Sequence, residues 1–190
     1  NVLYLSEEES VSVGAGDVSG IDLTLELADF PLPDTICESF DPLVFKRISL
    51  PTRPGVPEPL IEIQAGTMPV SGTVEICATP ILGVPGAHLL VGFAYEIEAR
   101  DSQGNLITED FNKSVRLIFY YNAELLGDFD PEDLAPAFFS TARQEWVELD
   151  DVYIDPDDWF VTGKTDHFTR IGVRGAEEAG DNMIYLPVVL

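Results

Sequence analysis

The residues of this sequence that could do chemistry are mostly carboxylates, and many of them lie close together. Between positions 118 and 162, twelve acids face a single base, Arg143. Two stretches stand out, DFDPED (128–133) and DDVYIDPDD (150–158). Clustered carboxylates on loops suit Ca²⁺, which binds about six to eight oxygens. We therefore predict a Ca²⁺ site in at least one stretch, with a solvated acidic surface as the alternative. The ligand candidates are Asp128, Asp130, Asp150, Asp151, Asp155, Asp157 and Asp158.

Catalytic signals are weak. His88 and His167 are the only histidines. His167 lies in TDHFT, where Thr165 and Asp166 could hold it by hydrogen bonds, so we expect a structural role rather than a general base or a metal ligand. The G-x-S-x-G and H-E-x-x-H patterns of hydrolases are absent. A glycosidase-type carboxylate pair would arise by chance among so many acids. We expect a protein that is not an enzyme and has no cofactor apart from Ca²⁺.

Two tryptophans and one asparagine could take part in recognition. Trp146 lies in EWVELD and Trp159 begins WFVTG, and both fit core positions in strands. If exposed, they would form an aromatic platform for sugars. Asn112 begins the glycosylation sequon NKS. These features support a runner-up function, a carbohydrate- or surface-binding adhesion module of a larger secreted protein.

Cys37 and Cys77 are the only cysteines. An even pair in an exported β protein predicts one disulfide, and two buried free thiols are the alternative. The bond would close a loop of about 40 residues, which the chain-entropy model values at roughly 4 kcal/mol.

The charge balance limits the partners. The chain of 190 residues carries 34 acids against 10 bases, a net charge of -24. Nucleic acid is therefore an unsuitable partner, since phosphate binding needs basic patches. No apolar run reaches the roughly 18 residues of a membrane span. The absence of a signal peptide and a start at Asn1 fit a processed protein, so we expect an extracellular or cell-surface location.

Period-2 alternation predicts an all-β fold, a β-sandwich of Greek-key or jelly-roll type with twelve to fourteen strands. We expect one domain over residues 1–190, with LGVPGA (82–87) as the candidate sub-boundary. The clearest expected strands are VSVGAG (11–16), IDLTLEL (21–27), LVFKRISL (43–50), LIEIQ (60–64), TVEICAT (73–79), LLVGFAYEIEA (89–99), SVRLIFYY (114–121), PAFFSTA (136–142), EWVELD (145–150), WFVTGKT (159–165) and FTRIGV (168–173).

The connections between these strands also carry signals. Residues 122–136 predict one or two short helical turns, with Asp130 as N-cap and Pro131 at the first helical position. DSQGN (101–105) predicts a hairpin turn that joins the strand ending at Arg100 to residues 106–121, with Gly104 at positive φ. PTRPGVPEP (51–59) predicts a surface loop.

The second half carries a longer pattern. An A-x-D-x-x-G-x-x-I hairpin precedes F-x-K-x-V-x-L-x-x-x-Y, then W-x-x-L and T-D-H-F-T. The matching residues are Ala99, Asp101, Gly104, Ile107, Phe111, Lys113, Val115, Leu117, Tyr121, Trp146, Leu149, Thr165, Asp166, His167, Phe168 and Thr169. On these residues, the stretch from about 90 to 173 resembles the β-sandwich module of the ankyrin and netrin-receptor type found in bacterial secreted and cell-surface proteins. The resemblance implies a structural or adhesive role without catalytic residues.

The two ends of the sequence share one apolar pattern, NVLYL and NMIYLPVVL, each beside an acidic stretch. Such segments are expected to dock in a sheet. They would pair within their own sandwich, complete the sheet of the next copy by strand donation, or link to another domain. Our leading hypothesis is a structural subunit of an extracellular filament, tube or surface layer that assembles head-to-tail with copies of itself. The residues expected to mediate assembly are Val2, Leu3, Tyr4, Leu5, Ile184, Tyr185, Leu186, Val188 and Val189.

Overall fold

The computed structural model describes residues 32–52, 54–81, 91–122, 126 and 129–175. The described elements are β1 (Ile36–Phe40), β2 (Lys46–Ser49), β3 (Leu60–Ile63), β4 (Val74–Ile81), β5 (Ala94–Arg100), β6 (Val115–Tyr120), the 3-10 helix η2 (Pro131–Asp133), β7 (Ala135–Ser140), β8 (Glu145–Glu148), β9 (Asp150–Asp155), β10 (Phe160–Thr165) and β11 (Arg170–Arg174).

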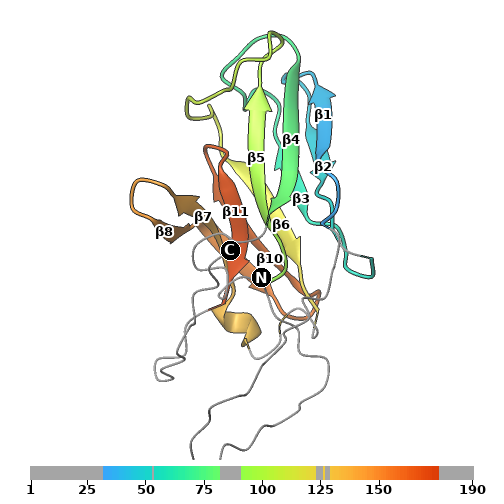
Figure 1. The fold of residues 1–190 in the computed structure, drawn as a ribbon, viewed down its shortest axis with the longest axis vertical. Helices are drawn as coiled ribbons and strands as arrows, with labels where there is room; N and C mark the ends of the chain where they lie inside the picture. The colour runs from blue at the N-terminus through green and yellow to red at the C-terminus, as the bar shows by residue number, and fades with distance from the viewer. Residues whose placement is uncertain (1–31, 53, 82–90, 123–125, 127–128, 176–190) are drawn as a thin grey trace, which may run out of the picture.

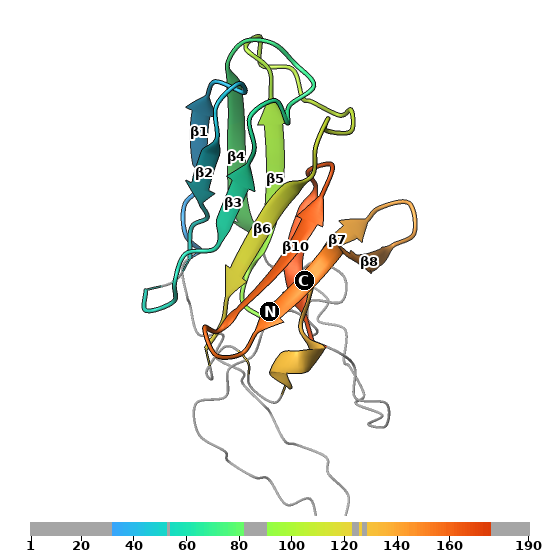
Figure 2. The same cartoon turned by 180° about the vertical axis from the view of Figure 1, so that it is seen from behind.

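Two antiparallel sheets form a sandwich. One sheet has six strands in the order β1-β4-β5-β11-β7-β8, and the other has five in the order β2-β3-β6-β10-β9 (Figure 1). The chain passes between the sheets at the connections β1–β2, β3–β4, β5–β6, β6–β7, β8–β9 and β10–β11. In the finished sheets β5 lies beside β11 (Figure 1) and β6 lies beside β10 (Figure 2). The predicted all-β sandwich is therefore confirmed.

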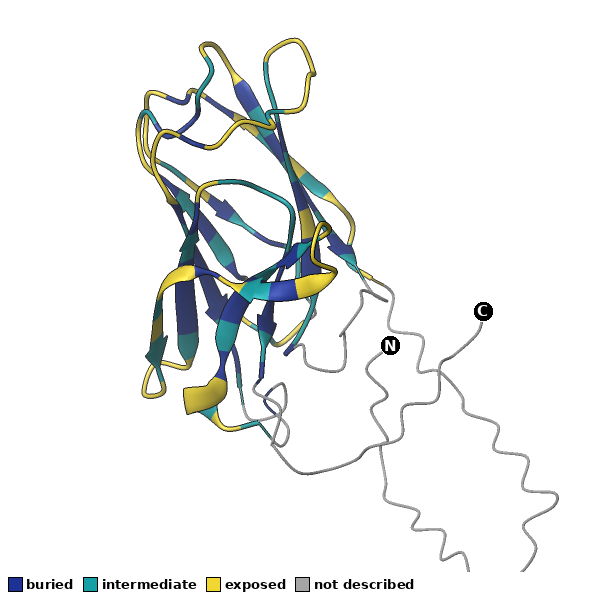
Figure 3. Cartoon of the chain, turned by 90° about the vertical axis from the view of Figure 1, so that its left-hand side faces the viewer, coloured by how far each residue is buried: buried dark blue, intermediate teal, exposed yellow. Residues whose placement is uncertain are grey.

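Alternating side chains build the core between the two sheets. In β4 every second residue is buried, as its sequence alternation predicts. Ile76 and Ile97 from the six-stranded sheet join Ile61, Leu117 and Val161 from the five-stranded sheet, each at most 2% exposed. The exposed residues gather in the turns (Figure 3). Because one set of side chains from each sheet is buried in this core, the alternate side chains of the same strands form the two outer faces.

A smaller apolar cluster lies on the opposite side of the six-stranded sheet. Phe138 packs on the main core, and its neighbour Phe139 therefore points the other way. Phe139 pairs across strands with Trp146, at 5.6 Å between ring centroids, and both are under 9% exposed. The predicted core position of Trp146 is thus confirmed, within this second cluster.

The turn at residues 101–105 forms as predicted, but the hairpin around it is short. Gly104 has φ 83°, and the backbone N–H of Asn105 donates to Oδ1 of Asp101. Side-chain and backbone donors from Asn105 hold the pKa of the Asp101 carboxyl below its ordinary value. After a bridge between Arg100 and Leu106 the chain leaves for the other sheet. The expected hairpin pairing of β5 with residues 106–121 is therefore wrong. β6 pairs instead with β3 and β10 in the five-stranded sheet, where it covers the core from the opposite side.

The helical turn and its cap are confirmed. Asp130 precedes η2 and its Oδ1 accepts the backbone N–H of Glu132 at 3.0 Å. Pro131 occupies the start of the helix, where a missing N–H costs nothing. Residues 51–59 connect β2 to β3 as the predicted loop, and only residue 53 of that loop lies outside the description.

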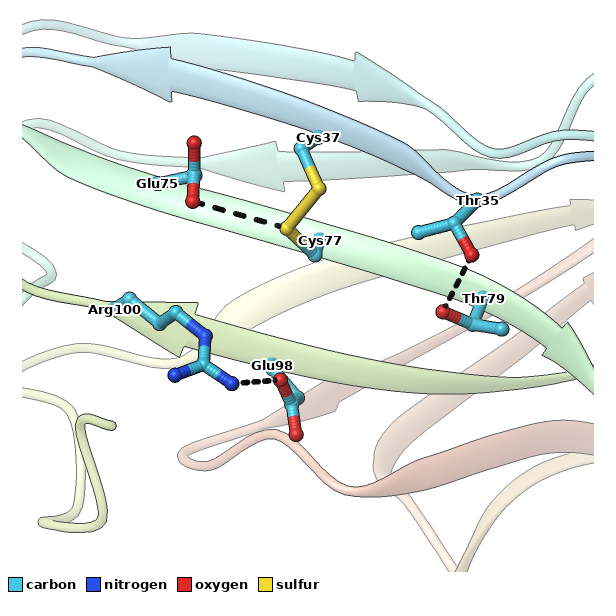
Figure 4. Close-up of a disulfide and its surroundings, with 7 residues drawn as sticks. All are labelled: Thr35, Cys37, Glu75, Cys77, Thr79, Glu98 and Arg100. Atoms are coloured by element: carbon cyan, nitrogen blue, oxygen red, sulfur yellow. Dashed lines mark hydrogen bonds and ion pairs between the residues drawn. A yellow bond between two sulfur atoms is a disulfide. The ribbon is translucent and has the colours of Figure 1, made fainter. Parts of the chain in front are cut away.

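The predicted disulfide forms between edge strand β1 and its neighbour β4. Cys37 and Cys77 are direct cross-strand partners with Cα atoms 4.1 Å apart. Both sulfur atoms lie on the outer face, in line with a hydrogen bond between the hydroxyls of Thr35 and Thr79 (Figure 4). On the inner side, Glu38 of β1 forms an ion pair with Lys46 of β2. Covalent and ionic contacts together close this side of the sandwich.

Candidate binding face

The outer face of the five-stranded sheet is organised in rows by strand register. Phe160 of β10 lies opposite Tyr120 of β6 and Asp155 of β9. Two residues further along each strand, and therefore on the same face, Tyr153 lies opposite Thr162. Directly opposed residues share a face in an antiparallel sheet. The register therefore brings three aromatic rings and one carboxylate together from three strands.

The three rings follow one another across the strands in the order Tyr153, Phe160 and Tyr120. We call them the aromatic row. Ring centroids lie 6.1 Å apart for Tyr153 and Phe160 and 6.2 Å apart for Phe160 and Tyr120. The planes are inclined by 50° and 68°. Tyr153 is 55% exposed, and the other two rings are half-buried. The row is thus accessible, and its rings are not coplanar.

Asp155 fixes the turn at one end of the aromatic row. Its Oδ1 accepts the backbone N–H groups of Asp157 and Asp158, at 3.2 and 3.0 Å. Its Oδ2 accepts the hydroxyl of Tyr153 at 3.2 Å. An aspartate that accepts these amides is the usual means of holding such a turn. The carboxylate of Asp155 is therefore engaged in hydrogen bonds within the turn, while its negative charge remains beside the rings.

The negative field of this turn acts on two tyrosines. The hydrogen bond to Asp155, and then its charge and those of Asp158 and Asp157, raise the pKa of Tyr153. Burial and the charge of Asp155 raise the pKa of Tyr121, whose side chain lies at the end of β6. The pKa shift of Tyr153 follows from the cost of placing a phenolate near a carboxylate, and that of Tyr121 follows first from burial. The aromatic row lies in a locally acidic environment.

The predicted core position of Trp159 is wrong. Trp159 precedes β10 in a turn, at φ 56°, and is 42% exposed. Its ring rests on Tyr121, with centroids 5.6 Å apart. A positive φ takes the side chain out of the strand alternation, so the pattern WFVTG could not reveal its direction. Trp159 adds an exposed ring at the same end of the sheet.

The carboxylates proposed as Ca²⁺ ligands do not all belong to one place. Asp130 caps η2, and Asp151 forms an ion pair with Lys164 at 2.8 Å, which lowers the pKa of its carboxyl. Asp150 and Asp151 belong to strand β9 rather than to a loop, so the loop reading of 150–155 was wrong. Asp155, Asp157 and Asp158 share one turn, and Asp128 lies outside the described residues. Within the described ranges, no group of three or more His, Cys, Asp or Glu is arranged to hold a metal ion.

A cavity of about 430 Å³ lies on the six-stranded sheet where β11 separates from β5. The backbone N–H of Ile97 still donates to Thr169, whereas Ala99 already accepts from Ile107, and the cavity opens between them. His167 lines it, with Nδ1 2.8 Å from Oδ1 of Asp166. The hydrogen bonds to Asp166 and to Thr165 predicted for His167 are thus present. Both Glu96 and Glu98, which also line the cavity, have an arginine partner, Arg170 and Arg100 respectively.

An exposed apolar turn joins β1 to β2. Leu43, Val44 and Phe45 are consecutive and are 75%, 50% and 50% exposed. Asp41 shapes the turn, since its Oδ1 accepts the N–H of Leu43 and its backbone oxygen accepts the N–H of Val44. The turn leads directly into β2, an outermost strand of the five-stranded sheet. Contiguous exposed apolar residues of this kind are typical of interaction surfaces.

The predicted assembly segments, Val2 to Leu5 and Ile184 to Val189, lie outside the described residues, as do the expected strands at 11–16 and 21–27, the proposed sub-boundary at 82–87 and His88. The strands on either side of that sub-boundary, β4 and β5, pair along seven positions of one sheet. No described helix is long and apolar enough to cross a membrane.

Comparison with known proteins identifies no relative. No family model matches the chain, and neither a curated protein nor a solved structure matches it. The motif residues of 90–173 are mainly buried or shape turns: Leu117 is fully buried, and Phe111 packs edge-on against Phe168 at 4.9 Å. The similarity to the ankyrin and netrin-receptor type of module stays a prediction based on those residues.

Proposed function

We propose that this protein is a non-enzymatic structural subunit of an extracellular filament, tube or surface layer. Copies assemble head-to-tail when an apolar terminal segment of one subunit adds a strand to the sheet of the next. The disulfide supports an oxidising location, since such bonds persist outside the cytosol. The strongly acidic chain requires that the contact offset like-charge repulsion.

One observation carries the proposal: an exposed apolar turn runs into an outermost strand of the five-stranded sheet. The turn of Leu43, Val44 and Phe45 leads to Lys46 and Arg47 in β2. The C-terminal sequence combines an apolar segment, MIYLPVVL, with the acidic stretch GAEEAGD before it. Lys46 and Arg47 are already paired with Glu38 and Glu62, so the complementarity to the donor rests on apolar contact at the turn. We place the acceptor site at the turn and β2, and Ca²⁺ bridges the remaining acidic surfaces.

Two variants of the full chain test this assignment. Deletion of residues 182–190 removes the donor, and L43S/F45S removes the apolar acceptor turn while leaving β2 intact. L106S is the matched control, because Leu106 is 48% exposed in a turn of the other sheet. Sedimentation velocity and electron microscopy, with Ca²⁺ and with chelator, report the polymer. We expect polymers from the intact chain and from L106S, and monomers from both other variants. A monomeric intact chain, or polymers that survive the deletion, would contradict strand donation.

The exposed rings of Tyr153 and Trp159 favour a second candidate, an adhesion module that binds a carbohydrate or another surface ligand. The two residues are 55% and 42% exposed, and they lie on either side of the turn formed by Asp155, Asp157 and Asp158. A protein of this kind would stay monomeric and bind its ligand through these rings. The sedimentation experiment separates the two candidates.

A further inference from the structure

We propose that the aromatic row binds a quaternary ammonium group, the headgroup chemistry of choline. The binding site consists of the exposed faces of Tyr153 and Phe160, with Tyr120 beside them and the carboxylate of Asp155 at one end. This inference goes beyond assembly and does not depend on it, since the acceptor site of the proposed filament lies on β2 and the preceding turn.

The geometry of the rings suits a compact cation. A cation is attracted to an aromatic face when it lies within about 6 Å of the ring centroid. The centroids of Tyr153 and Phe160 are 6.1 Å apart, so one group on the solvent side of both rings can lie within that distance of each. The planes are inclined by 50°, so the pair does not form a flat stacking surface. Stacking of an extended sugar chain needs rings in one plane, and this row does not provide it.

The hydrogen bonds that Asp155 already accepts determine which type of ammonium group the site favours. Its Oδ1 accepts the N–H groups of Asp157 and Asp158 and its Oδ2 accepts the hydroxyl of Tyr153, which leaves one acceptor position on Oδ2. A primary ammonium has three N–H donors that lose water on binding and need acceptors. A quaternary ammonium has none, and it uses only the aromatic faces and the long-range charge of the turn. The site therefore favours methylated nitrogen.

The test is a titration of the intact chain with choline at low ionic strength, followed by saturation-transfer NMR on the choline methyl signal. The neutral isostere 3,3-dimethyl-1-butanol separates charge from apolar contact. Tyr153→Leu removes a ring, and Tyr153→Phe keeps the ring and removes the hydroxyl. The circular dichroism spectrum of each variant checks that the sandwich forms. L106S serves as the surface control, at a similar exposure of 48% in the other sheet.

We expect choline to bind at least tenfold more tightly than its neutral isostere. Tyr153→Leu should weaken binding about fivefold or more, which corresponds to one exposed cation–π contact of about 1 kcal/mol, while Tyr153→Phe and L106S bind as the parent does. Equal binding of choline and the isostere would overturn the proposal, as would equal binding of choline and methylammonium, because simple hydrophobic or ionic attraction would then suffice. Binding of neutral oligosaccharides without choline binding would assign the face to glycans, and no binding at all would also refute the site. None of these outcomes alters the polymer, so failure here and failure of the assembly proposal are distinguishable.

Discussion

The disulfide makes the most quantitative prediction. The double variant C37A/C77A should lower the free energy of unfolding by about 4 kcal/mol, the value that the chain-entropy model gives for a loop of 40 residues. Both sulfur atoms lie on the outer face of the six-stranded sheet, with Cys37 exposed and Cys77 half-buried. Their loss therefore leaves no cavity in the core, and the effect comes from the greater freedom of the unfolded chain.

The native structure should survive this change, because β1 has other contacts. It pairs with β4 at five positions, the hydroxyls of Thr35 and Thr79 share a hydrogen bond of 2.9 Å, and Glu38 pairs with Lys46. Urea unfolding followed by the fluorescence of buried Trp146 gives both the midpoint and the slope. We expect a lower midpoint and a steeper dependence on urea, since the unfolded chain without the cross-link exposes more surface.

Thr79→Val is the matched control for the disulfide. It removes one exposed hydrogen bond from the same strand pair, so the loss should stay at about 1 kcal/mol or below. A loss below about 1 kcal/mol for the double cysteine variant, with an unchanged slope, would refute the argument from the unfolded state. A separate early transition would show instead that the bond holds β1 in place within the native state.

Three further predictions concern packing, capping and pH. Gly163→Ala should cost about 1–3 kcal/mol in urea unfolding, because a Cβ there would lie 2.8 Å from the Cβ of Leu149; a neutral result would mean that β10 can move away from this contact. Asp130→Ala should cost about 1 kcal/mol and Asp130→Asn much less, since the asparagine oxygen can still accept the amide of Glu132, and equal losses would contradict the cap. Burial raises the pKa of Tyr95 above the ordinary value of 10.0, so this tyrosine contributes stability that is fully present below pH 10 and declines as the pH rises through the folded value. Tyrosinate absorbance should therefore show that Tyr95 ionises only as the chain unfolds, and Tyr95→Phe should reduce the alkaline loss of stability, whereas early ionisation of Tyr95 in the folded chain would refute the effect of burial.

Most of the sandwich is predictable because its inner strands must bury every second residue. The alternation in β4 and β5 depends only on the core, and the sequence shows it directly. Two strands at the edges of the sheets escaped prediction. β1 has Glu38 at an inward position, where Lys46 neutralises it, and β9 carries acids beside only two inward aliphatic residues, Val152 and Ile154. An edge strand is solvated along one side, so its sequence can look like a loop.

The candidate site depended on contacts that local sequence does not contain. The aromatic row exists because Phe160 pairs with Tyr120 on one side and with Asp155 on the other, and such long-range register is set by the whole sheet. The exposure of Trp159 depends on a positive φ before β10. By contrast, the hydrogen bonds of His167 and the cap of η2 involve residues within three positions, and both were predictable.

The four outermost strands of the described sheets differ in ways that bear on assembly. β9 carries Asp150, Asp151 and Asp155 and has a register shift opposite Thr162 and Lys164, two features that discourage pairing with another chain. β8 has only four residues and begins and ends with glutamate, and β1 is joined covalently to β4. An apolar donor preceded by acids would meet repulsion at β9 and β8, which leaves β1 and β2, the strands on either side of the exposed apolar turn. β1 carries Glu38 and no base, whereas β2 carries Lys46 and Arg47, which are paired with Glu38 and Glu62. The exposed apolar turn therefore selects this side of the sandwich, and L43S/F45S should block polymerisation while a double charge reversal on β8 should not.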